Sequence, residues 1–126
     1  IARYLMNHAN LPADKIPYWD YNAGQPGFTP CGPNAAKYAA GTQPRDASAA
    51  AITASALLEL CNYAEAEESK QMIAFAQNIL QSLSTPAYRA AGKEAGGFLL
   101  KHSVGSIPHG GEIDVPLVYA DYYYIE

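Results

Sequence analysis

An alanine-rich segment at residues 47–66 constrains the fold more than any other part of this 126-residue sequence. Nearly all of its residues favour a helix. Asp46 stands directly before it, where a carboxylate can accept hydrogen bonds from the free N–H groups of the first turn. Apolar side chains form two stripes on this helix, Ile52, Ala56 and Leu60 on one and Ala50, Ala54, Leu57 and Cys61 on the other. Because a helix that is apolar on more than one face packs on more than one side, the segment predicts an all-α protein that encloses this helix.

Three further segments have helical patterns. Residues 1–10 carry apolar side chains at helical spacing, and residues 67–83 form a long helix that ends before Pro86. A last helix is expected from Asp114 onward, since Pro116 suits a first helical turn. Neither end of the chain carries a helix start or stop signal. We therefore expect both ends to be cut and the chain to be part of a longer helical protein. Because repeated helical hairpins stabilise one another, we do not expect the 126-residue piece to fold stably alone.

A long irregular segment, residues 11–45, separates the first helix from the alanine-rich one and is rich in glycine and proline. Irregular segments longer than about 12–15 residues in compact domains are usually functional or disordered. The aromatic residues around Asp20, at positions 18, 19 and 21, favour order, because large rings need a surface to pack against. Two interpretations stay open, a loop that plugs the end of a helical core and a loop that lines a substrate site.

Composition excludes several classes of function. The chain has 8 basic and 12 acidic residues, a formal net charge of -4, so neither nucleic acid nor an anionic membrane is an expected partner. No apolar run approaches the roughly 20 residues that span a bilayer, and no signal peptide is recognised in these residues. The two cysteines, Cys31 and Cys61, do not make a zinc site. A free thiol at Cys61 and a disulfide between the two cysteines both stay open.

Few residues suggest chemistry. Asp46 is explained as a helix cap, and Asp20 is open to a structural hydrogen bond, a substrate contact or catalysis, since paired carboxylates are the usual device of glycoside hydrolases. The loop that contains His102, Ser103, Ser106 and His109 offers hydroxyl and imidazole groups suited to sugar oxygens. No acid partner for a Ser/His nucleophile and no metal-binding spacing is evident, so we expect no metal or cofactor.

Five short segments together resemble the C-terminal part of the unsaturated glucuronyl hydrolases, glycoside hydrolase family 88. They are residues 17–21 (PYWDY), residues 45–52 (RDASAAAI) leading to residues 57–60 (LLEL), and residues 102–106 (HSVGS) with residues 118–123 (VYADYY). The resemblance covers nearly the whole chain and is weakest at residues 27–43. It implies that residues 1–126 are the C-terminal fragment of one catalytic domain, about the last third of an (α/α)6 toroid.

The resemblance also implies an activity. The family removes the unsaturated uronic acid that polysaccharide lyases leave on glycosaminoglycan-type oligosaccharides, by hydration of the C4–C5 double bond. Its two key aspartates lie in the N-terminal part, so no residue of this chain matches them and the fragment alone should be inactive. The implied partners are an unsaturated oligosaccharide and the rest of the same polypeptide.

Within this chain, the resemblance implies substrate contacts at Ser103 and Ser106, with His102 and Trp19 as further candidates. Ile107 and Pro108 stand where a lysine assists sulfate recognition in some members, so no sulfate preference follows. Two alternatives stay open, an unsaturated rhamnogalacturonyl hydrolase and a non-catalytic helical-repeat module that binds carbohydrate.

Overall fold

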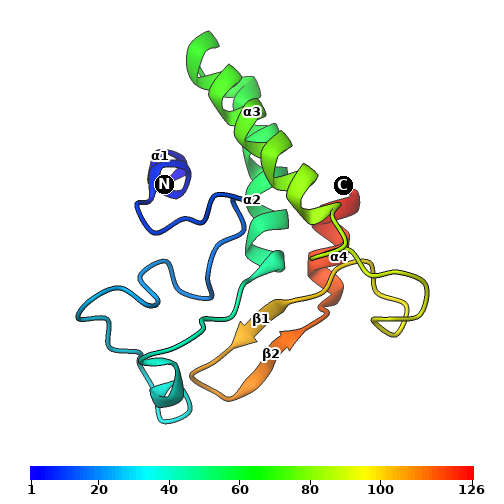
Figure 1. The fold of residues 1–126 in the computed structure, drawn as a ribbon. Helices are drawn as coiled ribbons and strands as arrows, with labels where there is room; N and C mark the ends of the chain where they lie inside the picture. The colour runs from blue at the N-terminus through cyan, green and yellow to red at the C-terminus, as the bar shows by residue number, and fades with distance from the viewer.

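The computed structural model describes all 126 residues and is mostly helical, with one small sheet (Figure 1). The helices are α1 (Ala2–Asn7), α2 (Ala47–Leu60), α3 (Ala66–Leu83) and α4 (Val118–Ile125), with short 3-10 turns at Ala36–Tyr38 and Cys61–Tyr63. The strands β1 (Ser103–Ser106) and β2 (Gly111–Val115) pair antiparallel. No helix has the length and apolar character needed to cross a bilayer.

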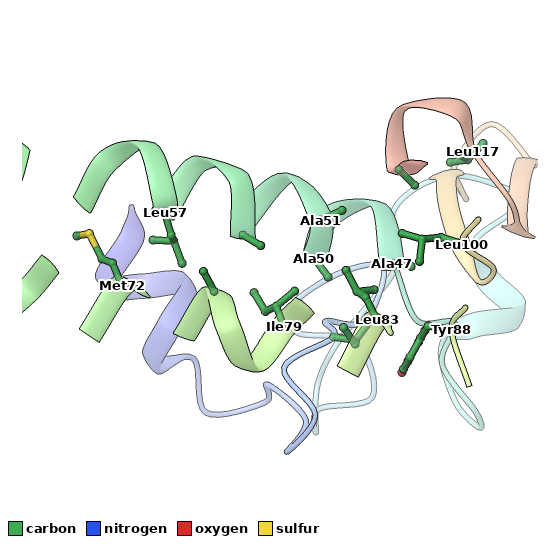
Figure 2. Packing of buried hydrophobic residues seen from close by; sticks show 14 residues of the cluster. Ala47, Ala50, Ala51, Leu57, Met72, Ile79, Leu83, Tyr88, Leu100 and Leu117 are labelled. Atoms are coloured by element: carbon green, nitrogen blue, oxygen red, sulfur yellow. The ribbon is translucent and has the colours of Figure 1, made fainter. Parts of the chain in front are cut away.

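The core lies between α2 and α3, which run side by side as a helical hairpin (Figure 1). The α2 face in the core is made almost entirely of alanine, and α3 supplies the larger side chains Met72, Ile79 and Leu83. Figure 2 shows Leu57 and Met72 at one end of this cluster, with Tyr88 and Leu100 toward the other. Alanine lets the two helices approach closely, so larger side chains from one partner fill the interface. The predicted alanine-rich helix is confirmed from Ala47, but it ends at Leu60 and not at residue 66.

Only one of the two predicted apolar stripes is enclosed. Ala50, Ala54 and Leu57 are buried, whereas Ile52 is 38% and Leu60 is 42% exposed. On the neighbouring helix α4, the side chains of Val118 and Tyr122 are also largely exposed. The helix α2 therefore contacts α3 and α4 and keeps an uncovered apolar face, which we call the Ile52 face, defined by Ile52, Ala56 and Leu60.

The region after Leu100 differs from the expectation of a loop followed by a helix from Asp114. Residues 103–115 form a β-hairpin in which Ser103 lies opposite Val115 and Ser106 opposite Gly111. Asp114 belongs to β2, and α4 begins only at Val118. The β-branched side chains of β1 and β2 favour strands, and Pro116 follows β2 instead of opening the helix. The chain is mostly helical, as expected, and in addition contains a two-stranded sheet that the sequence does not predict.

The glycine- and proline-rich segment packs against one end of the core. Ile16 is fully buried within the main cluster. Further along, the segment reaches the tip of the β-hairpin (Figure 1), where the Asn34 Nδ2 donates to the Pro108 carbonyl at 3.2 Å. Cys31 and Cys61 are both free thiols, so the disulfide considered from the sequence is not formed.

The carboxylate of Asp46 connects α2 to the β-hairpin. Its Oδ1 accepts from the backbone N–H groups of Ser48 at 3.0 Å and Ala49 at 3.3 Å, which confirms the predicted cap. The same atom also accepts from the Ser48 hydroxyl at 2.6 Å and from the Val104 N–H at 3.3 Å. One buried oxygen therefore accepts hydrogen bonds both from the first turn of α2 and from β1.

We predict that Asp46→Ala destabilises the full-length protein that contains this chain by more than a cap alone, which is worth about 0.5–2 kcal/mol. The added cost comes from the Val104 N–H, left buried without an acceptor, at about 1–3 kcal/mol. Asp46→Asn retains an acceptor oxygen and should cost much less. Urea-induced unfolding measures both, with Asp20→Ala as a control, because the Asp20 carboxylate accepts only from the Asn22 N–H in an exposed turn. Equal losses for the alanine and asparagine variants would contradict this account.

Candidate functional site

A polar groove of about 630 Å³ lies between the end of the glycine- and proline-rich segment, the residues after α3 and the β-hairpin. Lys37, Arg45, Tyr88, His102 and Asp114 are among the side chains that line it. A second hollow of about 400 Å³ adjoins it, and the two share the wall formed by residues 42, 43 and 45. We refer to the first as the Arg45 groove.

Arg45 is held rigidly in the groove wall. Its guanidinium donates to the Ile16 carbonyl and forms an ion pair with Asp14. The same group lies 5.2 Å from the Tyr18 ring and 6.0 Å from the Tyr88 ring, within cation–π range of both. With two aromatic rings, a carboxylate and a carbonyl as partners, Arg45 fixes the end of the irregular segment against Tyr88.

Tyr88 completes this cluster. Its hydroxyl donates to Asp14 Oδ2 at 3.0 Å, and only 7% of the residue is exposed. Burial raises the pKa of Tyr88 to about 12; Arg45 acts in the opposite direction, while the hydrogen bond to Asp14 adds to the rise. The Tyr88 hydroxyl is therefore a neutral hydrogen-bonding group at physiological pH.

His102 and Asp114 form a pair at the groove, with Nδ1 of the imidazole 2.6 Å from Oδ1 of the carboxylate. Both residues have left-handed backbone conformations, with φ of 61° at His102 and 57° at Asp114. They flank the irregular register of the hairpin between Ser103 and Val104. The pair therefore depends on two uncommon backbone conformations.

The two serines expected near the substrate have different environments. Ser103 is fully buried, and its hydroxyl has no hydrogen-bond partner. Ser106, at the other end of β1, is half-buried and its hydroxyl lies 2.7 Å from His109 Nδ1. Neither serine lines the Arg45 groove, whereas His102 does.

Trp19 and Asp20 have local structural partners. The Trp19 Nε1–H donates to Gln43 Oε1 at 3.0 Å, and the ring packs against Phe28 and Tyr38. Asp20 accepts from the Asn22 N–H at 2.7 Å in a turn. The structural hydrogen bond considered for Asp20 is therefore formed.

Sequence reasoning missed Arg45, Tyr88 and Asp114 as groove residues. Arg45 was recognised only within a family segment, and its ion pair spans 31 positions to Asp14. From the sequence, Asp114 is expected at a helix start, whereas it lies in β2. No group of three or more His, Cys, Asp or Glu side chains is placed to hold a metal ion.

These features define a helical hairpin with a β-hairpin at one end and a polar, aromatic-lined groove between irregular segments. The chain is 40% identical over 125 residues to an unsaturated glucuronyl hydrolase of Formosa agariphila, and 30% identical over 127 residues to an unsaturated chondroitin disaccharide hydrolase of Streptococcus agalactiae. No protein-family model matches it. The resemblance to unsaturated glucuronyl hydrolases is thus confirmed by sequence over 99% of the chain.

Solved structures of unsaturated glucuronyl hydrolases are also similar to this chain. A crystal structure of an unsaturated glucuronyl hydrolase specific for heparin matches 98% of the chain, with a TM-score of 0.79 and 43% identity. A Streptococcus agalactiae unsaturated glucuronyl hydrolase matches 98% of the chain, with a TM-score of 0.76 and 28% identity. The chain spans 27% of the Formosa protein, 28% of the streptococcal disaccharide hydrolase and 29% of the heparin-specific structure.

We predict that Tyr88 makes the protein lose stability at high pH. An unfolded tyrosine has a pKa of about 10, whereas folding raises the pKa of Tyr88 to about 12. Between these values the unfolded chain releases a proton that the folded chain retains, so stability falls as pH rises. Tyr88→Phe should weaken this fall. Urea midpoints measured across this window test it, with Tyr63→Phe as the control because Tyr63 is 78% exposed. An identical pH dependence in Tyr88→Phe and the parent would contradict the prediction.

Proposed function

We propose that the protein containing this chain is a glycoside hydrolase that removes the unsaturated uronic acid from lyase-generated oligosaccharides of glycosaminoglycan type. The observation that carries the proposal is 40% identity to an unsaturated glucuronyl hydrolase across essentially the whole chain. A mutant of an unsaturated glucuronyl hydrolase from Streptococcus agalactiae has been solved in complex with dGlcA-GalNAc6S. The proposed substrate for the present protein is of the same class.

The proposed reaction is hydration of the C4–C5 double bond. A carboxylic acid donates a proton to C4, water adds its oxygen to C5 and loses its proton, and the resulting hemiketal opens and releases the remaining saccharide. One water molecule is consumed for each bond cleaved. Within this chain, Asp20 and Asp46 are engaged by local backbone N–H groups, so we assign neither of them to this proton transfer.

The role proposed for residues 1–126 is to shape the substrate site. Ser106 and His102 are the accessible candidates for sugar contacts, since both side chains are partly exposed. Ser103 and Trp19 are retained as proposed contacts of the same region, although the Ser103 hydroxyl is covered and Trp19 is hydrogen-bonded to Gln43. Hydroxyl, imidazole and indole groups are the donors and acceptors that fit sugar hydroxyls.

The architecture proposed for the whole domain is the (α/α)6 toroid, of which this chain forms about the last third. The α2–α3 pair has the form of one helical hairpin of such a ring. The Ile52 face is the surface that would pack against a further helix of the same polypeptide. An apolar face on a helix is stabilised when a neighbour removes it from water.

We predict that the full-length protein hydrolyses unsaturated disaccharides, which is measured as loss of the ultraviolet absorbance of the double bond. Heparin-derived, chondroitin-derived and rhamnogalacturonan-derived substrates separate the candidate classes. Ser106→Ala should raise KM by about 2–10-fold, the value of one neutral hydrogen bond, with kcat unchanged, because such a contact acts equally in ground and transition states. Asn62→Ala, an exposed change in the 3-10 turn Cys61–Tyr63 that follows α2, is the control. Absence of turnover on every unsaturated substrate would overturn the proposed function.

We predict that Ile52→Ala destabilises the full-length protein by about 2–5 kcal/mol, as expected for a buried isoleucine, although Ile52 is 38% exposed within this chain. Ile79→Ala, at a position already 1% exposed in the core, gives the reference loss. Gln71→Ala on the exposed side of α3 gives the surface baseline. Urea unfolding measures all three. A change within about 0.5 kcal/mol for Ile52→Ala, typical of a surface position, would mean that no helix covers the Ile52 face.

A further inference from the structure

The carboxylate of Asp121 on α4 makes two hydrogen bonds that the proposed hydrolysis does not use. Its Oδ2 accepts from the Leu99 N–H at 2.8 Å and its Oδ1 from the Leu100 N–H at 2.9 Å. We propose that Asp121 is a positioning residue of the substrate site, which fixes the β-hairpin and the sugar contacts that the hairpin carries. This inference rests on the proposed function, because those contacts are the ones assigned there to His102 and Ser106.

The place of Asp121 in its own helix does not account for these hydrogen bonds. An acidic side chain in a first helical turn is stabilised by the helix dipole, and Asp121 lies in the first turn of α4. Both of its oxygens, however, accept from residues outside the helix, 22 and 21 positions earlier in the sequence. The carboxylate therefore joins α4 to the segment that leads into β1.

The segment that Asp121 holds is buried and runs directly into the hairpin. Leu100 has no exposed surface and lies in the main cluster with Leu117, which precedes α4 (Figure 2). A buried N–H group that loses its acceptor costs free energy, so removal of the carboxylate should shift this backbone toward water. Only Lys101 and His102 separate Leu100 from Ser103, where β1 begins. A shift of the segment therefore reaches the strand.

Two carboxylates hold the backbone that leads into the hairpin, one at each of two helices. Asp121 accepts from it at α4, and Asp46 accepts from the Val104 N–H at α2. Between these anchors, His102 has a left-handed φ of 61° and the buried Ser103 hydroxyl has no partner. Strained conformations of this kind persist only where the surrounding structure holds them. The position of Ser106, at the end of β1, therefore depends on both carboxylates.

The use of both Asp121 oxygens distinguishes this residue from Asp46. An asparagine keeps one acceptor oxygen and replaces the other by an NH₂ group, which would face an N–H donor. Asp121→Asn should therefore disturb the segment nearly as much as Asp121→Ala. The opposite is expected at Asp46, because its hydrogen bonds converge on Oδ1 alone and asparagine retains that acceptor.

The test uses the full-length protein and whichever unsaturated disaccharide, from chondroitin or from heparin, it hydrolyses faster. Both Asp121 variants should raise KM by about 2–10-fold, the value of one neutral hydrogen bond. The turnover number kcat should be unchanged, because the displaced sugar contacts act equally in ground and transition states. Glu126→Gln is the matched control and should leave KM unchanged. It also removes one negative charge at α4, but Glu126 accepts from Ser55 on α2 and not from the hairpin segment.

Hydrogen exchange gives a second readout that does not depend on turnover. Peptides covering residues 99–106 should exchange about tenfold or more faster in the Asp121 variants, as expected for loss of hydrogen bonds to a charged group. Peptides from α3 should keep the rate of the parent. If Asp121→Ala does not fold, Asp121→Asn, which keeps one acceptor oxygen, provides the same comparison.

The outcomes separate positioning from a purely structural role and from failure of the proposed function. A higher KM with unchanged kcat, together with faster exchange of residues 99–106, supports the proposal. Less folded protein lowers the apparent kcat and leaves KM unchanged, so an unchanged KM in both Asp121 variants overturns it. If the parent hydrolyses no unsaturated disaccharide, the proposed hydrolysis is overturned. Exchange then decides the role of Asp121, because parent-like rates in both variants exclude that it fixes the hairpin, whereas faster rates support it.

Discussion

The arrangement of this chain depends on the hydrogen bonds that the Asp46 carboxylate accepts. Its Oδ1 accepts from the first turn of α2 and from the Val104 N–H in β1. Backbone bonds at the same place reinforce the junction, since the Asp46 N–H donates to the Pro17 carbonyl and the Ala47 N–H to the His102 carbonyl. Three segments far apart in the sequence therefore meet at one helix N-terminus, where the free N–H groups and the helix dipole favour a negative charge.

The groove follows from that junction. Arg45 precedes Asp46 directly, so the backbone bonds that fix Asp46 also place the guanidinium beside Asp14 and between the Tyr18 and Tyr88 rings. His102 follows from the same geometry, because its carbonyl accepts from the α2 terminus while its side chain faces Asp114. Both walls are thus positioned from residues adjacent to the cap, and an irregular segment gains the rigidity that a binding site requires.

The sequence predicted the parts of the fold that depend on local pattern. The cap at Asp46 and the helices that became α2 and α3 are specified by propensity and spacing within a few residues. The β-hairpin was missed because its glycines and its left-handed residues, His102 and Asp114, obscure the strand pattern. The groove was missed because its contacts are long-range, as with Tyr88, which reaches Asp14 across 74 positions. No local pattern encodes such a pairing.

The residues that stabilise the core lie mainly on the helices, whereas the residues that line the groove lie mainly in irregular segments. The buried side chains of α2 are mostly alanine, which lets neighbouring helices approach closely. The helix is therefore stabilised by packing against α3 and α4 and, in the proposed toroid, against a further helix on the Ile52 face. Apart from Tyr88, which belongs to the buried cluster, the charged groove residues Arg45, His102 and Asp114 are held by paired charges and aromatic contacts. Substitutions in the groove can therefore alter recognition without loss of the core, whereas substitutions at Asp46 change both, because the cap joins the helix to the hairpin that carries His102 and Asp114. This coupling makes Asp46 a structural determinant of the site even though we assign it no chemistry.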